Sequence, residues 1–274
     1  MIVEIAPAKV NLALHVRCRR PDGYHDIETL FAFCADGDTV SLTPAKRQSL
    51  TITGPFSSGL SCGEDNLVLR AARAFAAAFG SDQTFAIRLD KNLPVASGIG
   101  GGSADAAATL RALARWHAID PADVRLVAIA AALGADVPAC LLGRTALGTG
   151  RGDDLCALGG LADIPILLVN PGIGVSTALV FGGWDGVDRG AIGRGDLLAM
   201  ARAGRNDLEP PARVVAPVIG AVRAMLDDAP GAMLSRMSGS GATCFALFES
   251  VEGRRAAARS AAAQRWWCLE SVLT

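Results

Sequence analysis

The sequence is organised around one segment, Pro94-Val95-Ala96-Ser97-Gly98-Ile99-Gly100-Gly101-Gly102-Ser103-Ala104-Asp105. Four glycines in five positions separate a strand expected over residues 84–89 from an alanine-rich helix expected over 104–116. Glycine lets the backbone adopt positive φ and approach a ligand closely, and the first N–H groups of a helix point toward an anion. The segment therefore predicts a phosphate-binding loop, with a flexible turn before a core helix as the alternative.

Three familiar nucleotide-binding patterns do not fit this segment. A P-loop needs a lysine after the glycines, and none follows them here. The dinucleotide-binding fingerprint needs glycine at its sixth position, where this chain has Ser103. The protein-kinase motifs His-Arg-Asp and Asp-Phe-Gly do not occur. The expected loop therefore differs from all three.

A second segment, Ala6-Pro7-Ala8-Lys9-Val10-Asn11-Leu12, lies within a stretch of strand-like alternation over residues 2–18. Lysine is rarely buried without a partner, so Lys9 in an apolar strand indicates a buried partner or a ligand phosphate. An edge lysine that reaches solvent is the alternative.

The segment Gly134-Ala135-Asp136-Val137-Pro138 follows an expected helix. Its carboxylate could pair with Lys9 and accept a proton from a hydroxyl, or Asp136 could belong to a simple turn.

Two further segments are candidates for ligand contact. Tyr24, the only tyrosine, precedes His25, one of three histidines, and an aromatic ring can stack on a base. A turn with a surface aromatic is the alternative. Near the other end, Met237-Ser238-Gly239-Ser240-Gly241-Ala242 is a small-residue loop before an expected strand over residues 243–248. Such a loop allows close approach of a ligand or another loop, and a tight turn is the alternative.

Composition excludes several classes of protein. The 274 residues include 26 Lys+Arg and 27 Asp+Glu, and this balance argues against a general nucleic-acid surface. No apolar run reaches 18 residues, so no membrane span is expected. The seven cysteines are odd in number and form no Cys-x-x-Cys, which favours the cytoplasm and indicates no zinc site.

Strands and helices mix without strict alternation, which predicts an α+β fold. A Gly- and Asp-rich stretch over 148–160 predicts two domains, 1–150 and 151–274.

These segments, in this order and spacing, resemble the GHMP kinase superfamily. Its three motifs are a Pro-x-x-(Lys/Arg)-(Val/Ile)-Asn strand, a glycine-rich phosphate loop and a C-terminal Gly-Ser/Thr-Gly-Ala loop, matched here by Pro7–Leu12, Gly100–Ser103 and Gly239–Ala242. The resemblance implies two domains, the first like ribosomal protein S5 domain 2 and the second ferredoxin-like. It also implies an ATP-dependent kinase of small molecules that uses Mg²⁺ with ATP.

The same resemblance assigns site residues. Lys9 and Asp136 match the catalytic pair. The positions that match the ATP site are Asn66, Leu67, Pro94, Val95, Ala96, Ser97, Gly98, Ile99, Gly100, Gly101, Gly102, Ser103 and Ala104. The positions that match the substrate site are Asn11, Tyr24, His25, Phe31, Thr177 and Phe181. Tyr24 and Phe181 would flank a cytosine. Position 104 is alanine where many relatives have serine, and no magnesium ligand is assigned.

Two other functions compete with a kinase for a cytidine diphosphate-linked substrate. One is another small-molecule kinase of the family, of the homoserine or mevalonate type. The Tyr24-His25 segment argues against it, because those substrates have no base to stack. The other is a non-catalytic nucleotide-binding protein or an S5-like RNA-binding protein. The acidic balance and the presence of both Lys9 and Asp136 argue against it.

Overall fold

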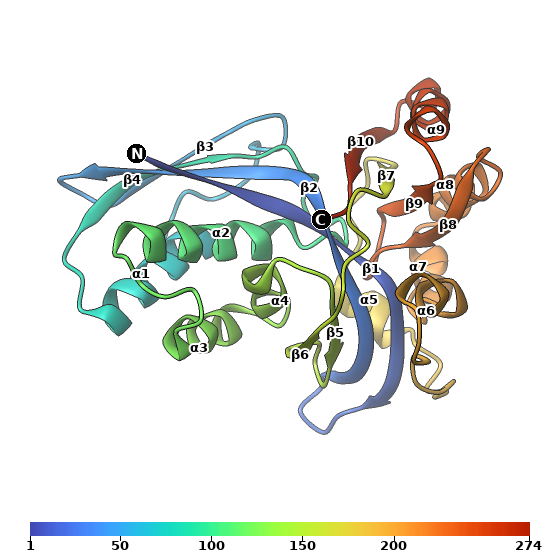
Figure 1. Cartoon of the computed structure of the whole chain (residues 1–274), viewed down its shortest axis with the longest axis horizontal. Coiled ribbons are helices and arrows are strands. Elements are labelled where there is room, and N and C mark those ends of the chain that lie inside the picture. Colours follow the sequence, from blue (N-terminus) through green and yellow to red (C-terminus); the bar gives the residue numbers. More distant parts are fainter. The chain divides into compact units, whose positions relative to one another are not determined.

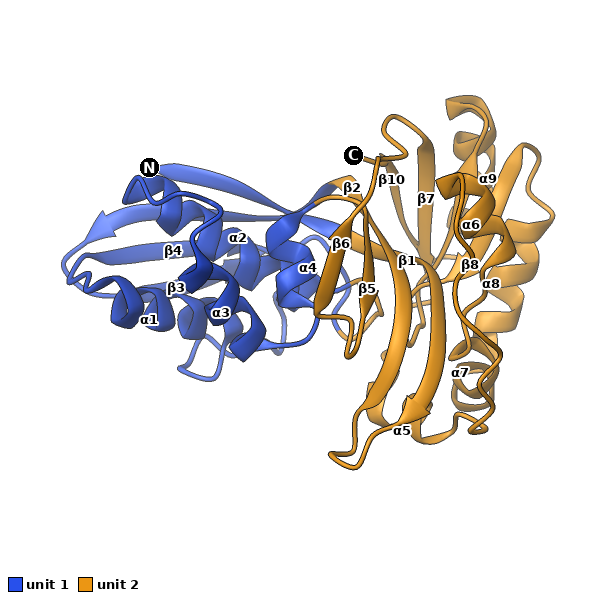
Figure 2. Ribbon diagram, turned by 60° about the horizontal axis from the view of Figure 1, so that its bottom comes forward, with its two compact units in different colours: residues 1–8, 36–95, 100–143 blue, residues 9–35, 96–99, 144–274 orange.

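The computed structural model describes all 274 residues and divides into two compact units that are interleaved in the sequence (Figure 2). The long strands β1 (Ile2–Arg19) and β2 (His25–Ala45) each contribute residues to both units. The first unit comprises residues 1–8, 36–95 and 100–143, and the second comprises 9–35, 96–99 and 144–274. The expected division of the sequence near residue 150 into two domains stays a prediction.

The first unit combines parts of β1 and β2 and two further strands with four helices (Figure 1). Strand β4 (Thr84–Asp90) pairs in parallel with β3 (Ser49–Thr53) and antiparallel with the C-terminal part of β2. The helices are α1 (Leu67–Phe79), α2 (Gly101–Trp116), α3 (Val124–Leu133) and α4 (Val137–Leu142). Alternate residues of β4, including Phe85, Ile87 and Leu89, are buried, as expected for a strand covered on one face.

Two helices begin at residues other than those the sequence indicates. The sequence predicts a helix over residues 66–79 with Asp65 as its cap. Asn66 is the N-cap of α1 instead, because its amide oxygen accepts a hydrogen bond from the Val68 N–H at 2.9 Å. Helix α2 begins at Gly101 rather than Ala104. The left-handed conformation of Gly100, with φ of +67°, makes it the N-cap and places two glycines in the first turn.

The second unit contains a four-stranded antiparallel sheet in the order β10-β7-β9-β8. Helices α8 (Val218–Asp227) and α9 (Val251–Ala263) share a hydrophobic cluster with alternate residues of its strands. The N-terminal part of β2 pairs with β5 (Ala146–Thr149), which pairs with β6 (Asp154–Ala157). The remaining elements are β7 (Pro165–Asn170), β8 (Ala232–Met237), β9 (Cys244–Phe248), β10 (Trp267–Val272), α5 (Thr177–Gly182), α6 (Leu197–Ala203) and α7 (Glu209–Val215).

The structure confirms the α+β class, with two corrections in detail. The sequence predicts two strands, over residues 27–34 and 38–43, but both belong to the single strand β2. It also predicts one helix over residues 212–226. The structure has two helices there, α7 and α8, because Pro217 forces the preceding Ala216 out of helical geometry, to φ of −140°. No helix of the chain has both the length and the apolar character that a membrane span requires.

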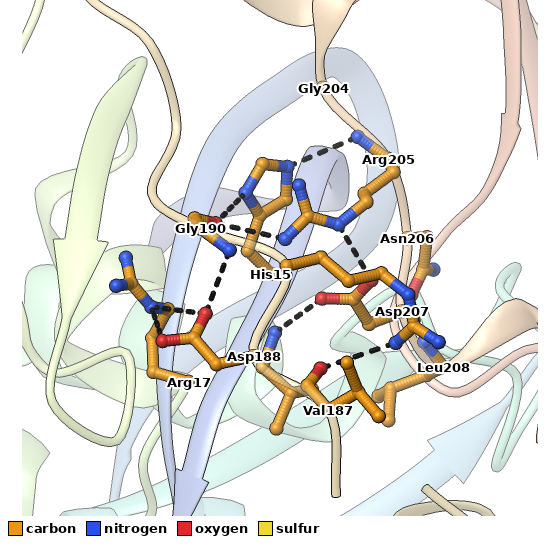
Figure 3. Close-up of polar contacts among 12 residues, drawn as sticks. His15, Arg17, Val187, Asp188, Gly190, Gly204, Arg205, Asn206, Asp207 and Leu208 are labelled. Atoms are coloured by element: carbon orange, nitrogen blue, oxygen red, sulfur yellow. Dashed lines mark hydrogen bonds and ion pairs between the residues drawn. The ribbon is translucent and has the colours of Figure 1, made fainter. Parts of the chain in front are cut away.

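A polar cluster fixes an irregular segment of the second unit against β1 (Figure 3). His15 is buried, with its Nδ1 3.0 Å from the Gly190 carbonyl and its Nε2 3.2 Å from the Arg205 N–H. The Arg205 guanidinium donates to the Asp207 carboxylate at 2.7 Å, and Asp207 also accepts the Val16 N–H at 2.8 Å. His15 therefore has the structural role expected for a histidine within a strand.

Candidate active site

Lys9 lies at the centre of a buried polar chain along β1. Side chains two residues apart on a strand share a face, so Lys9 and Asn11 are neighbours. The Lys9 Nζ donates to the Asn11 Oδ1 at 2.9 Å, and the Asn11 amide donates to the Thr29 hydroxyl at 2.7 Å. Lys9 is only 3% exposed, and its ammonium lies 5.4 Å from the centre of the Phe31 ring. Lys9 is therefore a buried, oriented cation rather than a solvated edge lysine.

The two small-residue loops pack directly on each other in the second unit. Gly98 has φ of +79°, and a Cβ there would lie 2.4 Å from the Ser238 carbonyl oxygen. A Cβ on Gly239 would lie 2.7 Å from the Gly98 oxygen. The Ser238 hydroxyl donates to the Gly98 carbonyl at 2.9 Å and accepts the Asn11 N–H at 3.2 Å. Ser238 thus joins the phosphate-loop segment to the strand that carries Lys9.

The first turn of α2 has the arrangement that binds an anion. The first hydrogen bond of the helix runs from the Ala104 N–H to the Gly100 carbonyl, at 2.8 Å. The N–H groups of Gly101, Gly102 and Ser103 therefore have no partner within the helix. A Cβ on Gly102 would lie 3.5 Å from the Leu67 side chain, so the start of α1 lies beside this turn. The structure thus brings two of the predicted ATP-site segments together.

Asp136 occupies the position before α4, after the chain leaves α3. Its backbone carbonyl accepts the Cys140 N–H at 3.1 Å, whereas its half-buried carboxylate does not cap the helix. Asp136 belongs to the first compact unit and Lys9 to the second, and their pairing stays a prediction.

Two of the predicted base-binding residues, His25 and Phe181, belong to an aromatic group in the second unit. The His25 ring lies 5.0 Å from the Phe181 ring and 5.7 Å from Trp184, which sequence analysis missed. Burial, with the neighbouring charge of Arg19, lowers the pKa of His25 and favours its neutral form. The Tyr24 ring is 54% exposed and lies 5.3 Å from the Arg151 guanidinium. A neutral His25 imidazole in contact with the Phe181 and Trp184 rings is suited to bind a planar, uncharged base.

Thr177 is the remaining predicted substrate residue, and it is connected to the glycine loops. Its hydroxyl lies 2.9 Å from the Ser240 hydroxyl, in the loop that follows β8. The Asn170 amide donates to the Thr243 hydroxyl at 2.9 Å at the other end of this loop. The second unit therefore contains all six predicted substrate residues.

Sequence analysis also missed a buried ionic cluster in the first unit. It consists of Asp38, Lys91 and Asp105, and it lies against the start of α2. Lys91 carries no sequence signal, because it precedes the turn-like residues Asn92-Leu93-Pro94 and resembles a solvated lysine. No group of three His, Cys, Asp or Glu side chains is arranged to hold a metal ion. Mg²⁺ in kinases is commonly held by one or two carboxylates together with the substrate phosphates, and does not require such a group.

Comparison with known proteins gives consistent matches over the whole chain. Residues 66–144 match the GHMP kinases N terminal domain, and residues 189–266 match the GHMP kinases C terminal. A 4-diphosphocytidyl-2-C-methyl-D-erythritol kinase of Rhizorhabdus wittichii is 56% identical, over 98% of this chain and 94% of the relative. The enzyme of the same name from Sphingopyxis alaskensis is 50% identical, over 97% of this chain and 96% of the relative.

Solved structures give the same picture. A crystal structure of 4-(cytidine 5'-diphospho)-2C-methyl-D-erythritol kinase matches with a TM-score of 0.81 and 37% identity, over 99% of both chains. A homoserine kinase from Cytophaga hutchinsonii matches with a TM-score of 0.74 and 21% identity, over 99% of this chain and 93% of that one. At 21% identity, the match to the homoserine kinase shows a shared fold and nothing about function.

Proposed function

This chain belongs to the GHMP kinase family, and on that premise we propose that it transfers the γ-phosphoryl group of ATP to the 2-hydroxyl of 4-diphosphocytidyl-2-C-methyl-D-erythritol. This reaction is a step of the non-mevalonate isoprenoid pathway, and we expect it to take place in the cytoplasm. The near-full-length identity of 56% supports the substrate. The structural observation that carries the proposal is the contact between the His25 and Phe181 rings, next in sequence to the exposed Tyr24, because a cytidine substrate has a base to stack there.

The chemistry follows from where charge develops. Phosphoryl transfer depends on alignment and on stabilising charge rather than on covalent catalysis. The N–H groups of Gly101, Gly102 and Ser103 bind the β- and γ-phosphates. Mg²⁺ bound with ATP supplies further neutralisation of that charge. Asp136 accepts the hydroxyl proton as the new P–O bond forms and the bond between the γ-phosphorus and ADP breaks, and Lys9 orients the hydroxyl.

Some of the substrate residues bind the cytosine, and others bind the methylerythritol part of the substrate. Tyr24 and Phe181 lie on either side of the cytosine, and His25 contacts its polar edge. Neutral imidazole can donate from one nitrogen and accept at the other, which suits the mixed donor and acceptor edge of cytosine. Asn11 and Thr177 hold the methylerythritol hydroxyl groups near Lys9, because both join the hydrogen-bonded loops around it.

A second candidate is a kinase for a different small alcohol, such as homoserine. The shared fold with a homoserine kinase favours it, and the aromatic group argues against it. The test is ADP release from Mg-ATP with the cytidine diphosphate substrate, with homoserine, with mevalonate and with no acceptor. We expect release only with the cytidine substrate. Release with homoserine or mevalonate alone would contradict the proposal, and release with no acceptor would indicate an ATPase.

A further inference from the structure

Three charged side chains are buried together in the first unit, and the mechanism above uses none of them. The Lys91 Nζ donates to the Asp38 Oδ2 at 2.5 Å and to the Asp105 Oδ2 at 2.7 Å. None of the three side chains is more than 4% exposed. Burying charges is costly unless they are paired and oriented, so this arrangement needs a physical reason.

The cluster fixes the chain that enters the phosphate loop. Asp38 lies on β2, and Lys91 directly follows β4. The second oxygen of Asp38 accepts the N–H of Asn92 at 2.5 Å and that of Leu93 at 2.8 Å. One carboxylate therefore holds both the Lys91 ammonium and the backbone immediately before Pro94. The entry to the loop cannot move without disturbing the ion pair.

The same cluster fixes the chain that leaves the loop. Asp105 lies one turn into α2, and a Cβ on Gly101 would lie only 3.0 Å from the Lys91 Nζ. The ammonium thus packs directly against the first turn of the helix. The other oxygen of Asp105, its Oδ1, is buried and has no hydrogen-bond partner. Through its Oδ2, Asp105 links the first turns of α2 to Lys91 and so to the chain that enters the loop.

We propose that Lys91, held by Asp38 and Asp105, is a positioning residue that fixes both ends of the glycine loop and so keeps the first turn of α2 ready to bind phosphate. The inference rests on the proposed function, since it assigns ATP phosphates to that turn. None of the three residues contacts the phosphates in this proposal. They act through the N–H groups of Gly101, Gly102 and Ser103.

The charge state of the cluster is consistent with this role. Burial raises the pKa of Asp105 to about 7, with Asp38 adding to the rise and Lys91 opposing it. Burial alone would lower the pKa of Lys91, but Asp105 and Asp38 outweigh it and raise that pKa. Lys91 therefore stays cationic, and near neutral pH its charge offsets most of the carboxylate charge beneath the phosphate-binding turn.

Two variants test the proposal, each measured by isothermal titration with ADP and with adenosine. Asp105→Ala removes the link to α2 and leaves the pair of Lys91 and Asp38. Asp38→Asn keeps an oxygen for the Asn92 and Leu93 N–H groups and loses the acceptor for Lys91. In each we expect ADP binding to weaken about tenfold, the lower end of what a hydrogen bond to a charged group is worth. Adenosine has no phosphate and should change less than about twofold.

Asp90→Ala is the matched control. Asp90 ends the same strand, and its carboxylate accepts from the Thr53 hydroxyl at 3.0 Å rather than from Lys91. We expect it to bind ADP as the parent does. Parental ADP binding in both cluster variants, or equal weakening of ADP and adenosine, would overturn the inference and leave the proposed function intact. If Asp105→Ala does not fold, Asp38→Asn decides alone. A parent chain that does not bind ADP would overturn both.

Discussion

At the scale of single residues, the proposed chemistry depends most on Asp136. Replacing it with asparagine removes the proton acceptor and keeps the size and polarity of the side chain. We expect Asp136→Asn to lower kcat by about 10²–10⁴, the usual contribution of a general base. Asparagine keeps an oxygen acceptor at this position, so the melting temperature should stay close to that of the parent. Initial rates of ADP release and a titration with ATP measure the two effects separately.

Asp123→Asn is the control for that experiment. Asp123 also precedes a helix, but its side chain accepts the Arg125 N–H at 2.9 Å and caps α3. Asparagine caps helices as well as aspartate does, so neither activity nor stability should change much. Near-parental turnover of Asp136→Asn would remove this residue from the mechanism.

Tyr24 is predicted to contribute to substrate recognition rather than to rate. Its exposed ring should stack on cytosine, and base–aromatic stacking is worth roughly 1–3 kcal/mol. We therefore expect Tyr24→Ala to weaken binding of the cytidine substrate by about 5- to 100-fold. Tyr24→Phe keeps the ring and should have a mild effect. ATP binding should change in neither variant. Titrations of each ligand separately give the result, and equal weakening of ATP by Tyr24→Ala would contradict a role in stacking.

At the scale of secondary-structure elements, the glycines of the phosphate loop have different tasks. Gly98 is needed because its φ is positive and a Cβ would collide with the Ser238 carbonyl at 2.4 Å. Gly102 lies in the first turn of α2, where a Cβ would make an ordinary contact of 3.5 Å with Leu67. We expect Gly98→Ala to abolish turnover or folding, whereas Gly102→Ala should fold normally. Thermal unfolding and ADP release of both variants test this, and a normally active Gly98→Ala would contradict the packing of the two loops.

The polar cluster around His15 predicts a dependence of stability on pH (Figure 3). Burial, with the nearby Arg205 charge, lowers the pKa of His15 below its ordinary value of 6.5. The folded protein therefore binds fewer protons than the unfolded chain in this range. The stability contributed by neutral His15 is fully present above pH 6.5 and is lost as the pH falls through 6.5 toward the folded-state pKa. The Nε2 that accepts the Arg205 N–H cannot accept it once protonated.

His15→Gln isolates this effect, because glutamine can donate and accept but does not titrate in this range. We expect the melting temperature of the parent to fall more than that of His15→Gln between about pH 7.5 and about pH 5.5. Differential scanning calorimetry at both pH values gives the comparison. Parallel losses in parent and variant would assign the pH dependence to other groups.

The sequence predicts the elements whose side chains repeat regularly and misses those defined by distant contacts. The apolar spacing of α1 is visible in the sequence because this helix buries one face, and a loose apolar–polar alternation marks β1. Short elements such as β3 and α4 are not, because five or six residues are too few to show a period. Lys9 stands out because it lies in an apolar strand. The partners of Lys91 are distant in the sequence, since Asp38 is 53 positions away and Asp105 is 14 positions away.

At the scale of the whole molecule, the two compact units do not follow the order of the chain. The buried cluster of the second unit includes Leu14 and Val16 from β1 and Ile27 from β2, more than a hundred residues before its other members. The backbone of Leu14 also bonds to Arg205 and Asp207, at 2.7 and 2.9 Å. The core of the second unit is therefore incomplete without the N-terminal strands.

This interleaving predicts that residues 151–274 do not fold alone, even though a domain boundary is expected near residue 150. The fragment lacks the side chains of β1 and β2 that fill its core, and removing a large buried aliphatic side chain typically costs 2–5 kcal/mol. Losing three such groups approaches the whole stability of a typical domain, about 5–15 kcal/mol. We expect the fragment to unfold without a cooperative transition in circular dichroism, and addition of a separate 1–150 fragment to restore one. A cooperative transition of 151–274 by itself would show that β1 and β2 cover this core without being needed to form it.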